Sequence, residues 1–464
     1  MNTPVMDALV EFVRDLEFAS LPADVVAGAQ RSVTDWFGTA IRGSVEPLAV
    51  AIGKVIDATG GEPQATVIAR RQKTSALFAA MANGAQSHSL DFDDTHLPSI
   101  VHGSSPVAPV VLALGEWKHL SGADVLAAFI AGFEVETRIG RQIGRRMTER
   151  GWHVTGNLGH FGAAAAAGKL LGLNAAQLAN ALGVAGTQAA GLTASFGTMA
   201  KPFHPGKAAM NGLLAAMLAR EGFTGGTQVI DGPGSLPETY LGVTDMSAVA
   251  EDLGKRYEIL ENSTKFYAAC HLTHASVDAA RALRERGVSV ADTIESVHCR
   301  VHPLVMKVAN QREPQTDLEA KFSIAYCVAS GLLRGDAGEA DFDAAALRDR
   351  ALRQVLARVT PEADSSIGIG VAEMTVRLTD GRVLQHRTTA ARGTPENPGT
   401  RDDVEAKFRG LAGVVFPEEK VTRLVTTLRR LPDLPDVAEL ATLASGHDTR
   451  VRGDHLGHRV LGRG

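Results

Sequence analysis

The sequence predicts a mainly α-helical protein with an α+β domain: a large all-helical domain formed by both chain ends, plus a smaller α+β lid domain. Ala/Leu/Val-rich segments with helical spacing extend to about residue 250, strand-like alternation appears after about residue 285, and helical patterns return after about residue 400. The 464 residues suffice for about two domains. We expect residues 1–270 and 400–464 to form the helical domain and residues 271–399 to form the lid.

The helical segments carry their own start signals. Ser121 and Asp124 form a capping pair before a helix whose apolar residues recur at three- and four-residue steps. Asn174 and Gln177 repeat the device before the next helix. The run GHFGAAAAAGKLLG, residues 159–172, has small residues on every face, which predicts a helix in the interior of a bundle.

The lid is predicted from its strands. Residues 294–301 alternate as a strand does, and residues 371–387 predict a hairpin with Asp380-Gly381 at a primed turn. Helical patterns lie between these strands, at 317–334 and 343–358. A Pro/Gly/Thr-rich stretch at 393–400 then marks the return to the helical domain.

The composition argues against several classes of partner. The formal net charge is −5, and no long block of Lys and Arg offers a surface for nucleic acid or an anionic membrane. No stretch approaches the ~20 apolar residues that span a bilayer, and the first residues do not resemble a signal peptide. The three cysteines form no CxxC pair, which argues against a disulfide scaffold or a thiolate zinc site. We therefore expect a cytoplasmic protein that binds neither nucleic acid nor membrane.

Histidine, with 15 residues, is the most informative residue type because its side chain titrates nearest neutral pH. The first cluster is the segment 88–96, HSLDFDDTH, followed by His102. Its acids would suit a divalent metal, or would cap and hydrogen-bond their own helix end. A third possibility is that Asp91 and Thr95 hold a substrate hydroxyl while His102 carries a proton.

Two more clusters border glycine or proline turns. His153 lies in GWHVTG before the Ala-rich helix, whose N-terminus would favour a carboxylate, whereas His160 is expected to be structural. In KPFHPGK a Pro-Gly turn is expected to lead into a helix, with Lys201 and Lys207 flanking His204. Ammonium groups there would neutralise carboxylates and stabilise an enediolate; solvated surface lysines are the alternative.

The last cluster, KFYAACHLTH, places Lys265, His271 and His274 at the predicted domain junction, where pockets are frequent. A nucleophilic thiol at Cys270 is disfavoured because adjacent Cys and His residues seldom face each other productively. The sequence has no GxGxxG between a strand and a helix, and no GxxxxGK[ST], GxSxG or HExxH. The nucleotide-binding, serine-hydrolase and zincin classes therefore lose their usual support, and acid–base chemistry on a small acid remains.

These segments together resemble the MmgE/PrpD family, which includes 2-methylcitrate dehydratase, cis-aconitate decarboxylase and iminodisuccinate epimerase. The resemblance extends nearly end to end and rests on LDFDDTH, HGSSPVAPVVLALGE, GWHVTGNLGHFGAAAAAGKLLGL, FGTMAKPFHPGKAAMNGLLAA, KFYAACHLTHASVDA, LEAKFSIAYCVASGLL and RGTPENPGT. It implies an all-α domain with an inserted lid, a homodimer, and an active site at the domain junction that uses no metal and no cofactor.

The resemblance also assigns individual residues. It implies that Asp91 and Thr95 belong to the substrate pocket. By position, it also implies that His102, His153, Lys201 and Tyr326 correspond to functional residues of the family. The chain departs from the decarboxylase pattern at Cys270, where that subgroup has a histidine, and His271 lies next to it. We expect the catalytic residues to be His102, His153, Lys201, His271 and Tyr326. We expect the substrate-binding residues to be Asp91, Thr95, His204, Lys207, Lys265 and His274.

The expected reaction begins with abstraction of a proton beside a carboxylate of a small di- or tricarboxylate. A neutral His102 or His153 would be the base, Lys201 with His204 or Lys207 would hold the carboxylates, and a second histidine or Tyr326 would be the acid. Dehydration by a lyase is the first expectation. An iminodisuccinate-like epimerase and a cis-aconitate decarboxylase-like enzyme are alternatives.

Two rival classes remain open. One is a metal-dependent hydrolase or lyase whose ligands would be Asp91, Asp93, Asp94 and His96. The other is a non-catalytic binding protein built on the same helical bundle, although a scaffold would have no need of His, Lys and Asp gathered beside Gly and Pro turns.

Overall fold

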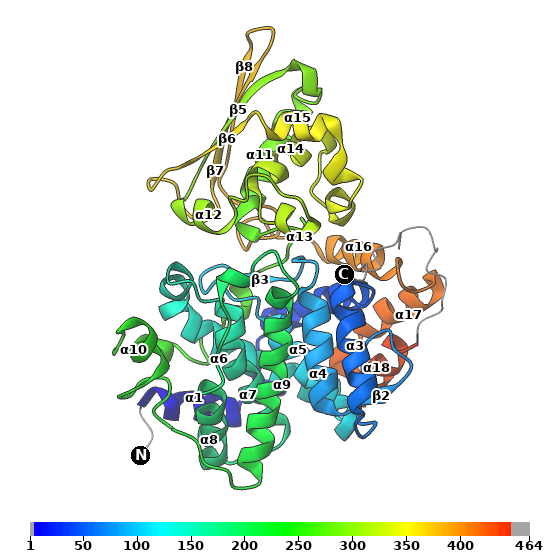
Figure 1. The fold of residues 1–464 in the computed structure, drawn as a ribbon. Helices are drawn as coiled ribbons and strands as arrows, with labels where there is room; N and C mark the ends of the chain where they lie inside the picture. The colour runs from blue at the N-terminus through cyan, green and yellow to red at the C-terminus, as the bar shows by residue number, and fades with distance from the viewer. Residues whose placement is uncertain (1–3, 447–464) are drawn as a thin grey trace, which may run out of the picture.

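The computed structural model describes residues 4–446, and Figure 1 shows a helical body with a sheet-bearing part beside it. The mixture of predominant helix with small sheets agrees with the predicted class. The helices of the body are α1 (Pro4–Asp15), α2 (Ala23–Gly43), α3 (Pro47–Thr59), α4 (Ala76–His88), α5 (Ser104–Lys118), α6 (Gly122–Glu149), α7 (Val154–Leu170), α8 (Ala175–Gly186), α9 (Ala200–Arg220), α10 (Leu236–Leu241), α16 (Arg401–Ala412), α17 (Glu418–Arg429) and α18 (Ala438–Ala444).

The centre of the body is α7, packed between α6 and α9. Every residue from Val154 to Gly168 is buried, which confirms the expected interior helix. Small residues let the backbones approach: a Cβ atom on Gly132 of α6 would lie 2.5 Å from the carbonyl oxygen of Gly162. The predicted caps also form, since Ser121 accepts from the N–H of Asp124 and Asn174 makes a capping box with Gln177.

One helix start differs from the prediction. Pro205 and Gly206, expected to form a turn, lie inside α9, which begins at Ala200. A proline near a helix N-terminus forfeits only one backbone hydrogen bond. Gly206 is needed because a Cβ atom there would lie 2.3 Å from the carbonyl oxygen of Met81, so the two residues serve the packing of α9 against α4.

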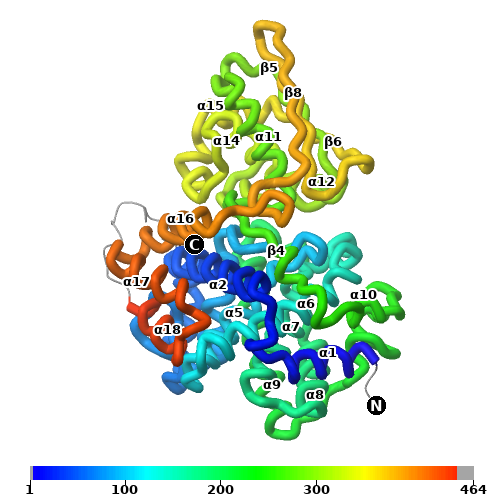
Figure 2. The backbone as a smooth tube through the Cα atoms, turned by 180° about the vertical axis from the view of Figure 1, so that it is seen from behind, coloured from blue at the N-terminus to red at the C-terminus, as the bar shows by residue number. Residues whose placement is uncertain are grey.

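The C-terminal helices pack on the N-terminal ones. Figure 2 shows α16 beside α2, and Phe408 belongs to the same hydrophobic core as Trp36 and Phe37. Lys407 Nζ lies 2.7 Å from Asp35 Oδ1 in a buried ion pair across these helices. Residues 447–464, which were assigned to the helical domain, lie outside the described residues.

The sheet-bearing part has its own hydrophobic core. Its sheet has the order β6-β5-β7-β8, with β5 parallel to β6 and the other pairs antiparallel, and α11 and α14 pack against it. Its elements are α11 (His274–Glu285), β5 (Ile294–Val301), α12 (Pro303–Val308), α13 (Asp317–Ala320), α14 (Ile324–Arg334), α15 (Arg350–Leu356), β6 (Val359–Ala363), β7 (Ala372–Leu378) and β8 (Val383–Thr388). The domain boundaries expected near residues 270 and 400 stay predictions.

Three local predictions for this part need correction. The hairpin forms, but its turn is not primed: only Gly381 has positive φ, 87°, and Leu378 N–H donates to the Arg382 carbonyl at 2.9 Å across a three-residue loop. The helix expected over 317–334 is interrupted, because Ser323 caps a new helix, α14. The helix expected over 343–358 is shorter, since Asp349 caps α15. Two-residue strands complete the fold: β1 (Ala65–Thr66), β2 (Lys73–Thr74), β3 (Thr95–His96) and β4 (Asn262–Ser263).

Among residues 4–446, none of the helices is long and apolar enough to cross a bilayer.

Candidate active site

A cavity of about 50 Å³ lies where the loop between α4 and α5 meets the starts of α7 and α9 and the segment that leads into α11. Its polar wall contains Asp91, Thr95, His102, Thr148, His153, Lys201, Cys270 and His271. Its apolar wall contains Leu97, Ile100, Trp152, Val154, Phe196, Leu272, Val308 and Phe322. Four stretches of sequence supply most of this wall, and Val308 and Phe322 of the sheet-bearing part complete it.

An ion pair defines the charged side of this cavity. Lys201 Nζ donates to Asp91 Oδ1, and both side chains are about 95% buried. Lys265, fully buried, donates to the Asp91 carbonyl oxygen at 2.9 Å, with its Nζ 3.5 Å from Asp91 Oδ1. Burial alone would raise the pKa of Asp91, but the two ammonium groups outweigh it and hold that pKa well below its usual value. Asp91 is therefore a carboxylate that orients two lysines.

His102 is oriented through one ring nitrogen. Its Nδ1 lies 3.4 Å from Thr95 Oγ1 and 3.5 Å from Asp93 Oδ2, while its backbone N–H donates to Thr155 Oγ1 at 3.0 Å. Burial lowers the pKa of His102 even though Asp93 opposes the shift, so the imidazole is neutral at neutral pH. With Nδ1 directed at Asp93, Nε2 is the nitrogen left for a substrate.

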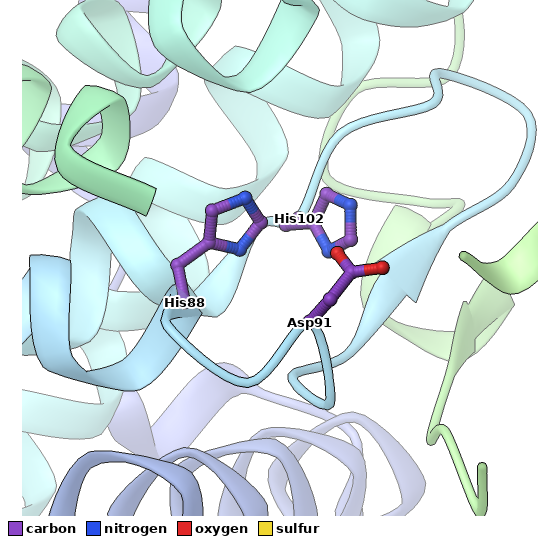
Figure 3. A group of neighbouring side chains, drawn as sticks. All are labelled: His88, Asp91 and His102. Carbon is purple, nitrogen blue, oxygen red and sulfur yellow. The ribbon is translucent and has the colours of Figure 1, made fainter. Parts of the chain in front are cut away.

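His88, which the sequence reasoning did not select, supports this arrangement. Its Nδ1 lies 2.7 Å from Asp93 Oδ2, which also accepts from Ser105 Oγ at 2.6 Å. The rings of His88 and His102 meet edge to face with centroids 4.5 Å apart, and Figure 3 shows both beside Asp91. Burial lowers the pKa of His88 to about 3. Asp93 thus positions two neutral histidines. The only signal for Asp93 in the sequence was that it is one of three acids close together in the segment 88–96.

His153, the N-cap residue of α7, forms a pair with His204 of α9. The two Nδ1 atoms are 2.8 Å apart, although the residues are 51 positions apart in the chain. Burial, and next Lys201, hold the pKa of His153 well below its usual value, whereas burial and Lys207 lower that of His204 to about 4. His153 lines the cavity, and His204 lies behind it.

The junction segment contributes His271 and Cys270 to the wall. Neither ring nitrogen of His271 has a hydrogen-bond partner among the described residues, and the side chain is buried. Burial and the nearby Asp91 raise the pKa of the Cys270 thiol to about 11, so it is neutral at neutral pH. A neutral thiol is a poor nucleophile, which agrees with the expectation against covalent catalysis by cysteine.

Five predicted site residues do not line the cavity: His204 and Lys265 contact the cavity residues His153 and Asp91, whereas Tyr326, Lys207 and His274 have partners elsewhere. The hydroxyl of Tyr326 donates to the Asp341 carbonyl at 2.7 Å within the second core, and Tyr326 is not among the residues that line the cavity. Lys207 donates to the Ala190 carbonyl at 3.0 Å, and His274 Nε2 lies 3.2 Å from the Ala269 carbonyl. Lys207 lies six positions after Lys201 on α9, a spacing that does not place two side chains on the same face of a helix.

The acidic residues of the segment 88–96 bond to different partners and do not surround one metal position. Asp94 accepts from Ser104 and from Asn262 Nδ2, the latter at 2.6 Å, and burial raises its pKa to about 7. His96 Nδ1 bonds Ser99 Oγ at 2.8 Å, and its Nε2 lies 3.0 Å from Glu258 Oε2. The four proposed metal ligands therefore do not form one site, which corrects that alternative.

Another trio, His88, Asp91 and His102, does offer ligand atoms within 4.8 Å of one another (Figure 3). A divalent cation there would lie beside Lys201 and Lys265, whose ammonium groups already contact Asp91. Two positive charges in a buried site oppose a third. The donor set fits a metal by distance, but the local charge does not favour one.

The apolar wall is the other feature that the sequence reasoning missed. Lys201 Nζ lies 5.2 Å from the ring centroid of Phe322 and 5.7 Å from that of Phe196. Phe196 also meets the ring of His153 edge to face at 5.2 Å. These rings exclude water from the ion pair, which strengthens electrostatic interactions there. Phe196 and Phe322 each lie within a motif already quoted, but nothing in the pattern distinguished them from core residues.

This fold and cavity define a class: an α-helical protein with a buried site suited to acid–base chemistry on an anion. Family models match the chain in two parts, the MmgE/PrpD N-terminal domain at residues 7–248 and the MmgE/PrpD C-terminal domain at residues 267–431. The chain belongs to the MmgE/PrpD family, so the resemblance is confirmed.

Several relatives align over almost the whole chain. The cis-aconitate decarboxylase of Homo sapiens is 29% identical, over 96% of this chain and 95% of its own length. That of Mus musculus is 28% identical, over 96% and 94%. The cis-aconitate decarboxylase-like protein oryM of Aspergillus oryzae is 28% identical, over 94% and 96%. A family that includes these lyases supports an enzyme acting on carboxylates.

Proposed function

We propose that the protein is a metal-independent lyase that transfers a proton at the carbon beside a carboxylate of a small di- or tricarboxylate. One observation carries the proposal: two neutral histidines with different partners, His102 and His153, line the same cavity as the ammonium group of Lys201. A neutral imidazole accepts a proton, and a fixed cation stabilises the enediolate that results.

The roles follow from the partners. Lys201, held by Asp91, binds the carboxylate of the substrate, and its charge becomes more effective as negative charge develops beside it. His102 and His153 present Nε2 because their Nδ1 atoms are engaged. Thr95 and His271 line the cavity and are available to a hydroxyl or a second carboxylate.

We propose dehydration of a hydroxy acid as the reaction. Loss of water needs both a base for the C–H group and an acid for the leaving hydroxyl, and two separately oriented histidines supply both. An epimerase would share the first step and then return the proton to the opposite face.

Decarboxylation is the second candidate, favoured by the names of the relatives. It needs chiefly a proton donor for the carbanion that forms when carbon dioxide leaves. The resemblance implies a histidine of the decarboxylase subgroup at the position of Cys270, where this chain has a neutral thiol; either the adjacent His271 takes that role or the chemistry differs. We place dehydration first because of this departure from the pattern that the resemblance implies.

A screen in deuterated buffer tests the proposal. Metal-free protein is incubated with 2-methylcitrate, citrate, cis-aconitate and iminodisuccinate and followed by NMR. We expect an alkene from a hydroxy acid. Deuterium uptake without an alkene supports an epimerase, and carbon dioxide from cis-aconitate supports a decarboxylase. Turnover that appears only after a divalent metal is added would overturn the metal-independent mechanism.

A further inference from the structure

The pair of histidines behind the cavity has an unusual bonding pattern. The hydrogen bond joins Nδ1 of His153 to Nδ1 of His204 at 2.8 Å, with ring centroids 5.1 Å apart. A hydrogen bond between two nitrogens contains one proton, so one Nδ1 donates and the other accepts. Each neutral ring carries a single N–H. The ring that accepts through Nδ1 must therefore carry its proton on Nε2.

The fold makes specific room for this second imidazole. His204 lies one turn after Lys201 on α9, and His153 is held by its N–H, which donates to the Gly191 carbonyl at 3.0 Å. A Cβ atom on Gly156 would lie 2.8 Å from His204 Cβ, and one on Gly191 would lie 3.2 Å from His204 Nδ1. Gly156, the last residue of the GWHVTG segment, and Gly191 thus permit the contact.

The single shared proton gives the pair two states. In the first, His153 donates through Nδ1, and its Nε2 has a free electron pair that can take a proton from a substrate. In the second, His204 donates through Nδ1, and His153 carries a proton on Nε2 that it can give. His153 lines the cavity, whereas His204 does not, and His204 keeps 9% of its surface exposed.

We propose that His204 is a relay residue that passes protons between His153 and solvent, and so converts His153 from a base into an acid within the catalytic cycle. This inference rests on the proposed function. In the forward step the C–H bond breaks, its electron pair stays on the substrate as an enediolate, and the proton joins His153 Nε2. The proton on His153 Nδ1 moves to His204 Nδ1, and the proton on His204 Nε2 leaves to water.

The reverse sequence donates a proton to the substrate, and every proton is accounted for without an oxidant or reductant. The relay also avoids a lasting imidazolium in the buried wall. Burial disfavours the charged form of His153, and the neighbouring Lys201 disfavours it further. A proton that moves on through His204 leaves both rings neutral again. His204 is thus not needed to hold a carboxylate, the role expected from the sequence.

The test uses full-length His204→Ala, which removes the second imidazole and leaves space for a small molecule. We expect kcat to fall about 100-fold, as for loss of a proton-transfer group, with KM little changed. Added imidazole is expected to restore kcat in a saturable manner. Arg220→Gln, in the last turn of the same helix and paired with the exposed Glu221, is the control and is expected to keep the wild-type kcat.

A second variant separates relay from positioning. The amide of His204→Gln can hydrogen-bond His153 and hold its ring, but it cannot carry a proton through and fills the space that imidazole would use. We expect a low kcat without rescue. A wild-type kcat in His204→Gln would overturn the relay, as would a loss in His204→Ala that imidazole does not restore.

Histidine ¹⁵N NMR examines the pair independently of turnover. In the wild type we expect one Nδ1–H and one Nε2–H shared between His153 and His204, and in His204→Ala a changed tautomer ratio for His153. If no tested acid reacts, the turnover screen contradicts the proposed function. The spectrum still shows whether His153 and His204 share a proton through their Nδ1 atoms. A His153 tautomer that is the same in both proteins would overturn the inference.

Discussion

Replacing Lys201 by methionine separates its effect on stability from its effect on catalysis. Methionine has a similar length and retains the contacts with the rings of Phe196 and Phe322, but it lacks the charge. The change leaves Asp91 buried, with only Lys265 Nζ at 3.5 Å from Oδ1. Breaking a buried pair by removing one partner costs about 3–5 kcal/mol. Lys265 remains nearby, so we expect the lower end, about 3 kcal/mol.

The effect on substrate binding follows from the same contact. A hydrogen bond to a charged group contributes about 1.5–3 kcal/mol, which corresponds to roughly 10- to 100-fold in an equilibrium constant. We expect kcat/KM of Lys201→Met to fall by at least about 10-fold, and further if the ammonium group interacts more strongly with the enediolate than with the substrate. Initial rates over a range of acid concentrations measure this, and urea unfolding measures the stability.

Two comparisons make the result decisive. Arg220→Met, in the last turn of the same helix, should retain wild-type kinetics. The double variant Lys201→Met/Asp91→Asn removes the uncompensated carboxylate, so it should regain most of the lost stability without regaining activity. Kinetic constants of folded Lys201→Met within about twofold of wild type would refute the assignment of Lys201 to the substrate carboxylate.

Further predictions concern His102, the pH dependence of kcat/KM, the absence of a metal requirement, and the ion pair between Lys407 and Asp35. His102→Gln should lower kcat by about 10²- to 10⁴-fold, measured by initial rates, with an unchanged urea midpoint; a smaller loss would remove His102 from proton transfer. Burial lowers the pKa of His102 below its usual 6.5, so the neutral base persists under mildly acidic conditions. The value of kcat/KM should stay level as pH falls through 6.5 and decline only below it; a midpoint at 6.5 would contradict this. Removal of metal by a chelator, checked by metal analysis, should leave kcat unchanged. A requirement for stoichiometric metal would contradict the argument that the lysines beside Asp91 disfavour a bound cation. Lys407→Met should destabilise the fold by about 3–5 kcal/mol in urea because it leaves Asp35 buried, and Asp35→Leu in the same chain should restore most of this; additive losses would contradict a direct pair.

The parts of the fold that local sequence determines were predictable. A cap such as Asn174 with Gln177 involves residues three apart, and an Ala-rich helix is recognisable from its own composition. The local predictions that were wrong concern segments whose conformation depends on packing or loop geometry rather than on neighbouring residues in the sequence. Pro205 and Gly206 resemble a turn locally, but close approach of α9 to α4 requires the glycine within a helix. The hairpin turn depends on loop length and on the φ of Gly381, which Asp-Gly alone does not specify.

The sequence was enough to predict which segments form the site, but not which side chains contact one another there. The histidine and lysine motifs identified the segments that contain His102, His153 and Lys201, since polar residues beside turns are accessible to chemistry. Which side chains face the cavity depends on helix rotation, and the sequence pattern does not show that Tyr326 and Lys207 bond to backbone carbonyls instead. The pairing of His153 with His204 links positions 51 apart, and no local pattern encodes such a contact.

The most direct test of metal-free proton transfer by this cavity compares metal-stripped wild-type protein with His153→Ala in deuterated buffer, with the reactive acid followed by NMR. We expect the wild type to convert or deuterate the acid without metal, and folded His153→Ala to do so at least about 100-fold more slowly. Equal rates in the two proteins, or wild-type turnover that returns only with added divalent metal, would contradict it.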